Sequence, residues 1–177
     1  TLQEMGGNLS LSNHRIEGGE DVADIEVRSS QLHGIDVPAS RAASMIDEYP
    51  ILSIAAACAS GKTHMIGVGE LRVKETDRIA VMAEGLRRCG VEIDETDDTM
   101  TVLGTNSGGD DTSAHSFIAG GVIIASKHDH RIAMSFLILG MVSKSPINVE
   151  DVSTIATSFP GFAALMNNAG AKIERQS

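Results

Sequence analysis

Two stretches of the chain are hydrophobic on every side, and each indicates a helix that is buried all round. They are residues 51–59 and residues 132–142. Acidic residues precede both stretches, Asp47 and Glu48 before the first and Asp129 before the second, as is typical of helix N-termini. A helix without a polar face must be covered by other elements along its whole length. The pattern therefore predicts helices inside the domain and sheets outside them.

A third helix, expected over residues 77–89, has only one hydrophobic face. Ile79, Met82 and Leu86 recur at helical spacing, Asp77 is a good N-cap residue, and Gly90 suits the C-terminal end. Residues 64–69 before it are expected to form a strand. The helix thus begins soon after a strand ends.

The connection between that strand and that helix carries an unusual charge cluster. Lys74, Glu75 and Arg78 lie at or next to the helix N-terminus, where free backbone N–H groups and the helix dipole favour an anion. Acids stabilise such a helix start and bases do not, so capping alone does not explain the two bases. The cluster indicates a site for a phosphorylated or carboxylated substrate that must also exchange a proton.

The remaining segments are expected to be mostly strands and turns. A last amphipathic helix opens at Phe159 and ends at Gly170, and residues 104–113 form a loop in which Asp110 and Asp111 are solvated. The expected strands are 8–14 and 24–30 around the Gly18–Gly19 turn, 32–37, the hairpin of 91–94 and 100–103, 117–126, 146–150 and 171–174.

An internal repeat is visible in these elements. Gly6, Gly90 and Gly170 each end a helix and are followed three residues later by an aliphatic side chain, and Asp47 and Asp129 are related by a similar spacing. A strand-helix-strand-helix-strand-strand unit of roughly 80 residues thus occurs twice, preceded by the tail of a third. The chain is therefore expected to be a piece of something longer.

Composition narrows the class of protein. The chain has 177 residues, of which 42% are hydrophobic and 21% charged, as in an ordinary globular domain. A net charge of -10 argues against a nucleic-acid or anionic-membrane surface. Cys58 and Cys89 lie in apolar helical patterns, which predicts reduced core thiols in a cytoplasmic protein. His128 and His130 have no third ligand at a suitable spacing, so neither a metal nor a cofactor is expected.

Four motifs together resemble one family. The sequence RVKETDRI at 72–79 resembles the Lys-Glu-[Ser/Thr]-Asp-Arg motif of the 5-enolpyruvylshikimate-3-phosphate (EPSP) synthases, the shikimate-pathway enzymes inhibited by glyphosate. DEYPIL, DHRIAM and ATSFPGF at 47–52, 129–134 and 156–162 resemble its other motifs in the same order. The resemblance implies an inside-out α/β barrel, or prism, of βαβαββ units with buried parallel helices and outer four-stranded sheets. Residues 1–177 would form most of the C-terminal domain, without the N-terminal partner domain.

The resemblance also implies a reaction. The family transfers the enolpyruvyl group of phosphoenolpyruvate to the 5-hydroxyl of shikimate 3-phosphate and releases phosphate. By resemblance, Asp47 binds the attacking hydroxyl and accepts its proton. Glu75 is the candidate acid for the methylene carbon, although Lys74 could equally be the immediate donor, and Lys74 would also contact the shikimate ring.

Four further residues are expected to bind substrate. Arg78 and Arg131 stand at helix starts and suit a bidentate carboxylate clamp. By resemblance His130 lines the same cleft. By resemblance, Thr157 occupies the place of a lysine that many family members carry, so one cationic contact is missing or supplied from elsewhere. Glyphosate sensitivity stays open, because its main determinants are expected in the absent domain.

Two other interpretations remain at this point. A UDP-N-acetylglucosamine enolpyruvyl transferase would share the fold, but the two motifs around Lys74 and Arg131 favour the shikimate enzyme. A non-catalytic anion-binding domain of the same fold is the alternative outside enzymology, and the joint presence of the acidic and basic candidates argues against it.

Overall fold

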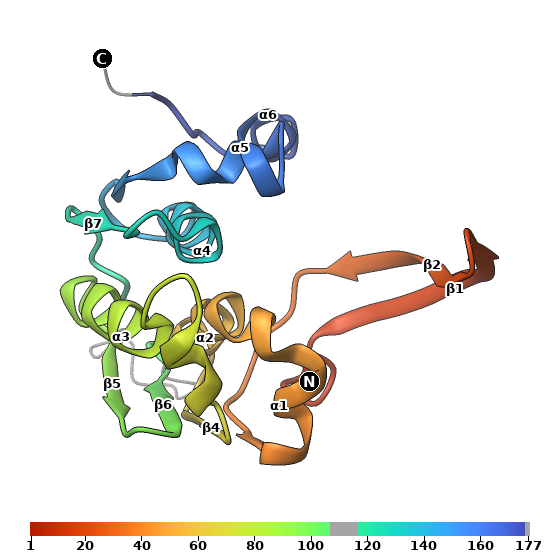
Figure 1. Cartoon of the computed structure of the whole chain (residues 1–177), viewed down its shortest axis with the longest axis horizontal. Helices are drawn as coiled ribbons and strands as arrows, with labels where there is room; N and C mark the ends of the chain where they lie inside the picture. The colour runs from red at the N-terminus through yellow and green to blue at the C-terminus, as the bar shows by residue number, and fades with distance from the viewer. Residues whose placement is uncertain (107–116, 176–177) are drawn as a thin grey trace.

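Three helices pack against one another in the middle of the molecule (Figure 1). They are α2 (Tyr49–Ala57), α3 (Arg78–Arg88) and α4 (His130–Gly140) of a computed structural model that describes residues 1–106 and 117–175. The side chain of Asp77 caps α3 by accepting a bond from the backbone N–H of Ala80 at 3.0 Å. Asp129 caps α4 in the same way. Both N-caps confirm the sequence prediction.

The contact between α3 and α4 is unusually close. A Cβ atom added to Gly85 of α3 would lie 2.2 Å from the end of the Phe136 ring of α4. Phe136 is fully buried and belongs to the hydrophobic core. The missing side chain at Gly85 therefore lets an aromatic ring fill the space between the two helices.

A four-stranded sheet covers one side of these helices, in the order β3 (Asp36–Val37), β4 (Lys62–Ile66), β6 (Thr99–Leu103), β5 (Glu92–Glu95). β3 and β4 are parallel, and the other pairs are antiparallel. Met65, Met100 and Val102 on the inner face are fully buried. The prediction of helices inside and an outer four-stranded sheet is confirmed for this unit.

Most of the expected strands have different bounds, and one is not found; the strand expected at 32–37, for example, shortens to β3 (Asp36–Val37). The strand expected at 64–69 lies at 62–66, because residues Gly69–Val73 form a 3-10 helix. The strand expected at 117–126 shortens to β7 (Ile123–Ala125), since Gly120 and Gly121 both have positive φ, which breaks the extended backbone. Within the described residues, 171–174 pair with no neighbouring strand and are not assigned as one.

The rest of the second unit is smaller. β7 pairs in parallel with β8 (Asn148–Glu150), and α5 (Ile155–Ser158) and α6 (Phe162–Asn168) follow beyond α4 (Figure 1).

The two helices expected to be buried differ: α2 is buried except near Ile51, whereas Met134, Leu137 and Ile138 leave one face of α4 only half-buried. The loop positions Asp110 and Asp111 lie outside the described residues. The short helices are η1 (Ala39–Arg41), α1 (Ala42–Met45), η2 (Ile46–Glu48), η3 (Gly69–Val73) and η4 (Val152–Thr154).

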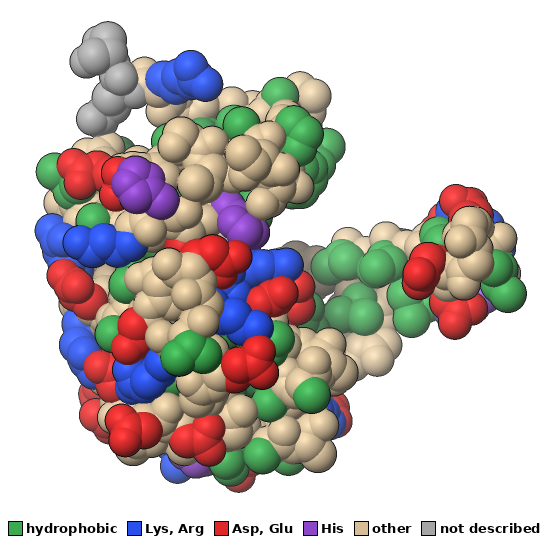
Figure 2. All heavy atoms as spheres, in the orientation of Figure 1, with side chains coloured by type: hydrophobic (Ala, Val, Ile, Leu, Met, Phe, Trp, Pro, Cys, Tyr) green, Lys and Arg blue, Asp and Glu red, His purple; other side chains and the backbone are tan. Residues whose placement is uncertain are grey.

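The first two strands project from the body as a hairpin (Figure 1). β1 (Asn8–Glu17) pairs antiparallel with β2 (Glu20–Arg28), with a register shift between Ser12 and Arg15. Hydrophobic side chains lie uncovered along it in Figure 2. Leu11, Ile25 and Val27 of the hairpin are 51%, 65% and 70% exposed. This hairpin is the segment that the sequence analysis interpreted as the tail of a preceding unit.

Candidate active site

Arg78 is the centre of the site predicted from the sequence. It is the first residue of α3, and only 1% of its side chain is exposed. Its guanidinium bonds three carboxylates: Asp129 at 2.7 Å, Asp47 at 2.8 Å and Glu75 at 2.5 Å. Ion pairs between a guanidinium and carboxylates are among the strongest hydrogen bonds in proteins. The N-terminal ends of α2, α3 and α4 are thus joined at one cation.

The three carboxylates differ in their exposure to solvent. Asp47 and Glu75 have side chains that are 45% and 50% exposed, so they line an accessible surface. Asp129 is completely buried. Figure 2 shows basic and acidic side chains mixed where the surface turns inward, between the part that contains α5 and α6 and the hairpin. Asp47 and Glu75 are therefore able to meet a ligand, and Asp129 is not.

The environment keeps Asp47 ionised. Burial raises its pKa, but the hydrogen bond from Arg78 and the charges of Arg131, Arg78 and Lys74 outweigh burial and lower the pKa overall. For Arg78 burial again opposes the charge, and the bond to Asp129 with the surrounding acids raises its pKa. Asp47 is thus held in its ionised form.

Arg131 is attached to the same group from α4. Its Nη1 donates to the Asp47 carbonyl oxygen and to Glu48 Oε1, both at 2.9 Å, and its Nη2 lies 3.7 Å from Asp47 Oδ2. With 30% of its side chain exposed, it remains open to a ligand on one side. Glu48, expected only to cap or to be solvated, is in fact a partner of Arg131.

Lys74 directly follows the 3-10 helix η3 and precedes α3. Its ammonium group bonds Glu70 Oε1 at 2.6 Å, and its side chain is 23% exposed. Its charge also contributes to the lowered pKa of Asp47. The sequence analysis did not single out Glu70, whose i, i+4 spacing to Lys74 was the available signal.

The other expected substrate-binding residues are less connected. His130 begins α4 and is half-buried. Thr157 is exposed, and its hydroxyl donates to the Thr154 carbonyl at 2.7 Å, a bond within its own turn. α5, which carries Thr157, packs on α4, which carries Arg131. In the described part of the chain, Thr157 thus contributes no bond to the cluster around Arg78.

Two other features bear on the kind of site. Within residues 1–106 and 117–175, no three His, Cys, Asp or Glu side chains are grouped so as to hold a metal ion. Over the same residues, no helix has the length and hydropathy needed to cross a bilayer.

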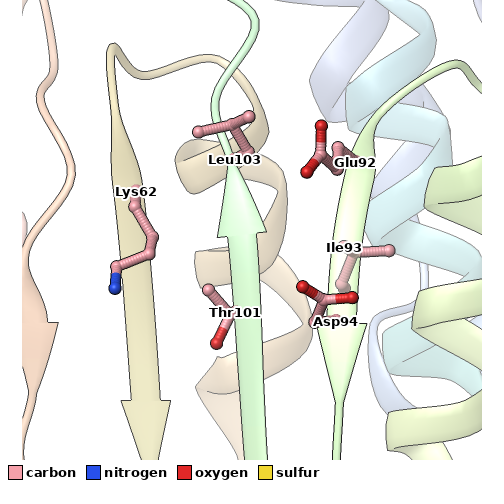
Figure 3. Close-up of a pocket in the computed structure, with 6 residues that line it drawn as sticks. All are labelled: Lys62, Glu92, Ile93, Asp94, Thr101 and Leu103. Carbon is pink, nitrogen blue, oxygen red and sulfur yellow. The ribbon is translucent and has the colours of Figure 1, made fainter.

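A pocket on the outer face of the sheet is lined by Lys62, Thr101 and Asp94 among others (Figure 3). Arg78 is not among the residues that line it.

Comparison with known proteins decides the family. The model of the family described as EPSP synthase (3-phosphoshikimate 1-carboxyvinyltransferase) matches residues 1–166. The chain belongs to the EPSP synthase family. Proteins named 3-phosphoshikimate 1-carboxyvinyltransferase from Parvibaculum lavamentivorans and Chelativorans sp. are each 54% identical, over 97% and 98% of this chain.

Solved structures agree with this assignment. An EPSP synthase from Acinetobacter baumannii is 47% identical over 99% of the chain, with a TM-score of 0.90, and this confirms the inside-out α/β fold of the EPSP synthases. The enolpyruvyl transferase NikO from Streptomyces tendae is 15% identical with a TM-score of 0.62, and this likeness concerns the fold alone. The chain spans 36% and 37% of the two relatives' own lengths.

Asp129 is the main residue that the sequence analysis did not assign to the site. It lies in the DHRIAM motif of the EPSP synthases and had been interpreted only as a helix start. Its spacing from Asp47 matched the internal repeat, and the structure brings these two equivalent positions to the same guanidinium. That spacing was the signal for it.

Proposed function

We propose that this chain supplies one half of the active-site cleft of an enzyme that transfers the enolpyruvyl group of phosphoenolpyruvate to the 5-hydroxyl of shikimate 3-phosphate, releasing phosphate. The observation that supports it best is the convergence of Asp47 and Glu75 on Arg78, with Arg131 beside Asp47, in a chain 54% identical to proteins named for that reaction. The reaction requires cations that hold a carboxylate and a phosphate, and acids or bases that transfer protons. The two arginines and the two carboxylates are groups of these kinds.

The proposed roles follow from exposure and charge. Asp47 accepts the proton of the attacking hydroxyl as the new C–O bond forms. Glu75 or Lys74 delivers a proton to the methylene carbon. Arg131, and Arg78 once Asp47 or Glu75 yields its place, bind the substrate carboxylate. His130 and Thr157 are proposed to line the cleft around these groups.

Arg78 must exchange partners for this role. Four of its hydrogen bonds already go to Asp129, Asp47 and Glu75, so an incoming carboxylate competes with the two half-exposed acids. The acid that is displaced is released toward the substrate by that exchange. The same event thus binds the substrate carboxylate and frees a group that transfers a proton.

We also propose that the chain forms most of the C-terminal domain, and that the remaining unit packs on the hairpin. The internal repeat relates Leu9 to Ile93 and Val27 to Val102. Leu9 pairs with Val27 between β1 and β2, as Ile93 pairs with Val102 between β5 and β6. Val102 is 0% exposed beneath α2 and α3, whereas Val27 is 70% exposed.

The expected cytoplasmic location is supported by the two free cysteines.

The test is phosphate release from phosphoenolpyruvate and shikimate 3-phosphate. We would replace the matching segment of the Parvibaculum lavamentivorans relative with this chain and compare that chimera with the chain alone. The chimera should turn over, and the chain alone should not, because the opposite wall of the cleft is missing. Asp47→Ala should reduce turnover at least a thousandfold, and Asp94→Ala on the outer sheet face should leave it within about twofold.

Each interpretation predicts a distinct result. A folded chimera that binds phosphoenolpyruvate without turnover would support the anion-binding domain instead. Turnover with UDP-N-acetylglucosamine in place of shikimate 3-phosphate would support the other transferase. Turnover by the isolated chain would refute its dependence on a partner domain.

A further inference from the structure

We infer that Asp129 is a positioning residue that keeps the Arg78 guanidinium aimed at the cleft while Arg78 exchanges its other partners. This inference rests on the proposed function of the Arg78 site. Asp129 is 0% exposed, so it cannot touch a substrate, and its effect must pass through Arg78. It differs in this respect from Asp47, the residue at the equivalent position of the preceding repeat.

Asp129 holds Arg78 from the inner side. Its Oδ2 accepts from Arg78 Nε at 2.7 Å, and its Oδ1 lies 3.4 Å from Arg78 Nη2. The other two partners, Asp47 and Glu75, bond the outer nitrogens and are half-exposed. When a substrate carboxylate displaces either of them, the Nε bond to Asp129 remains.

Asp129 is itself held in place. Its Oδ1 accepts from the backbone N–H groups of Arg131 at 2.9 Å and Ile132 at 3.3 Å, as the N-cap of α4. The two residues before it, Lys127 and His128, both have positive φ, at 55° and 60°. Residues other than glycine rarely adopt that backbone conformation, so the backbone before Asp129 is bent against its local preference. This bend places Asp129 in the interior.

One carboxylate therefore sets the geometry of both arginines. It bonds the side chain of Arg78 and the backbone of Arg131, whose own side chain contacts Asp47. A buried carboxylate with both oxygens occupied has no freedom to rotate, unlike the exposed acids. The two cations of the carboxylate clamp are thus kept in register by a group that never meets the ligand.

The test is Asp129→Asn in the chimera described above. Asparagine caps a helix about as well as aspartate, so α4 stays capped while the charge that holds Arg78 is lost. We expect KM for phosphoenolpyruvate to rise at least tenfold and kcat to fall, with KM for shikimate 3-phosphate within about threefold. The matched control is Asp77→Asn, which makes the same change at the N-cap of α3 without touching Arg78.

A second readout does not depend on turnover. The Arg78 Nε–H is buried and bonded, so in a 1H–15N spectrum of arginine-labelled chimera it should exchange slowly with water. Asp129→Asn should speed that exchange at least tenfold, and Asp77→Asn should not. Arg78→Lys identifies the signal by removing it.

The outcomes separate this inference from the proposed function. An inactive but folded parent chimera refutes the function, while the exchange experiment still tests the positioning of Arg78. Equal increases in both KM values, or the same increase in Asp77→Asn, would show a general loss of structure and overturn the inference. Unchanged exchange and kinetics in Asp129→Asn would overturn it as well.

Discussion

Replacing Gly85 with alanine tests how tightly α3 and α4 pack. The new Cβ would lie 2.2 Å from the Phe136 ring, whereas carbon atoms in contact are about 3.5–4.0 Å apart. The ring or the helix must therefore move by on the order of 1 Å. Such overpacking costs about 1–3 kcal/mol, and the higher helix propensity of alanine returns about 0.5–1 kcal/mol. We expect a net loss of about 1–2 kcal/mol in the free energy of unfolding.

A double-mutant cycle isolates this contact from helix propensity. In a Phe136→Leu background the ring is gone, so Gly85→Ala should become neutral or stabilising by up to about 1 kcal/mol. The free energies are measured by urea denaturation of the chimera and its three variants under one set of conditions. If Gly85→Ala stabilises the parent as much as it stabilises the Phe136→Leu variant, the two helices are not in the contact described.

Three further predictions concern other parts of the chain. The hydrogen bond from Arg41 lowers the pKa of Glu4 from 4.5 to about 2. This pair therefore adds stability above pH 4.5 that is lost as the pH falls toward 2. An NMR titration of the Glu4 carboxyl should show a midpoint of about 2, and Arg41→Gln should return that midpoint toward 4.5. Burial raises the pKa of the Cys89 thiol to about 11, so iodoacetamide at pH 8 should label Cys89 only in denaturant, and rapid labelling of folded protein would contradict its burial. Val27→Ser should lower the thermal midpoint of the chimera by several degrees but leave that of the isolated chain nearly unchanged, and equal effects would argue against a unit packed on the hairpin.

Local patterns in the sequence determined much of the fold. The caps at Asp77 and Asp129, the hairpin of β5 and β6, the burial of α2 and the apolar face of α3 were all predicted. Each depends on a side chain and its neighbours within a turn or two, which is the information that periodicity and capping carry. The repeat of Asp47 and Asp129 was visible in the same way.

The tertiary structure alone decided what those two aspartates do. Both meet Arg78, but packing buries Asp129 completely and leaves Asp47 half-exposed, so one is suited to hold the arginine and the other to meet a substrate. No local pattern encodes that difference, because exposure depends on which distant segments cover a residue. The bounds of β4 and β7 depended likewise on the 3-10 helix that follows β4 and on the positive φ of Gly120 and Gly121. The sequence thus determined which residues carry charge at helix starts, and long-range packing determined their partners and their access to solvent.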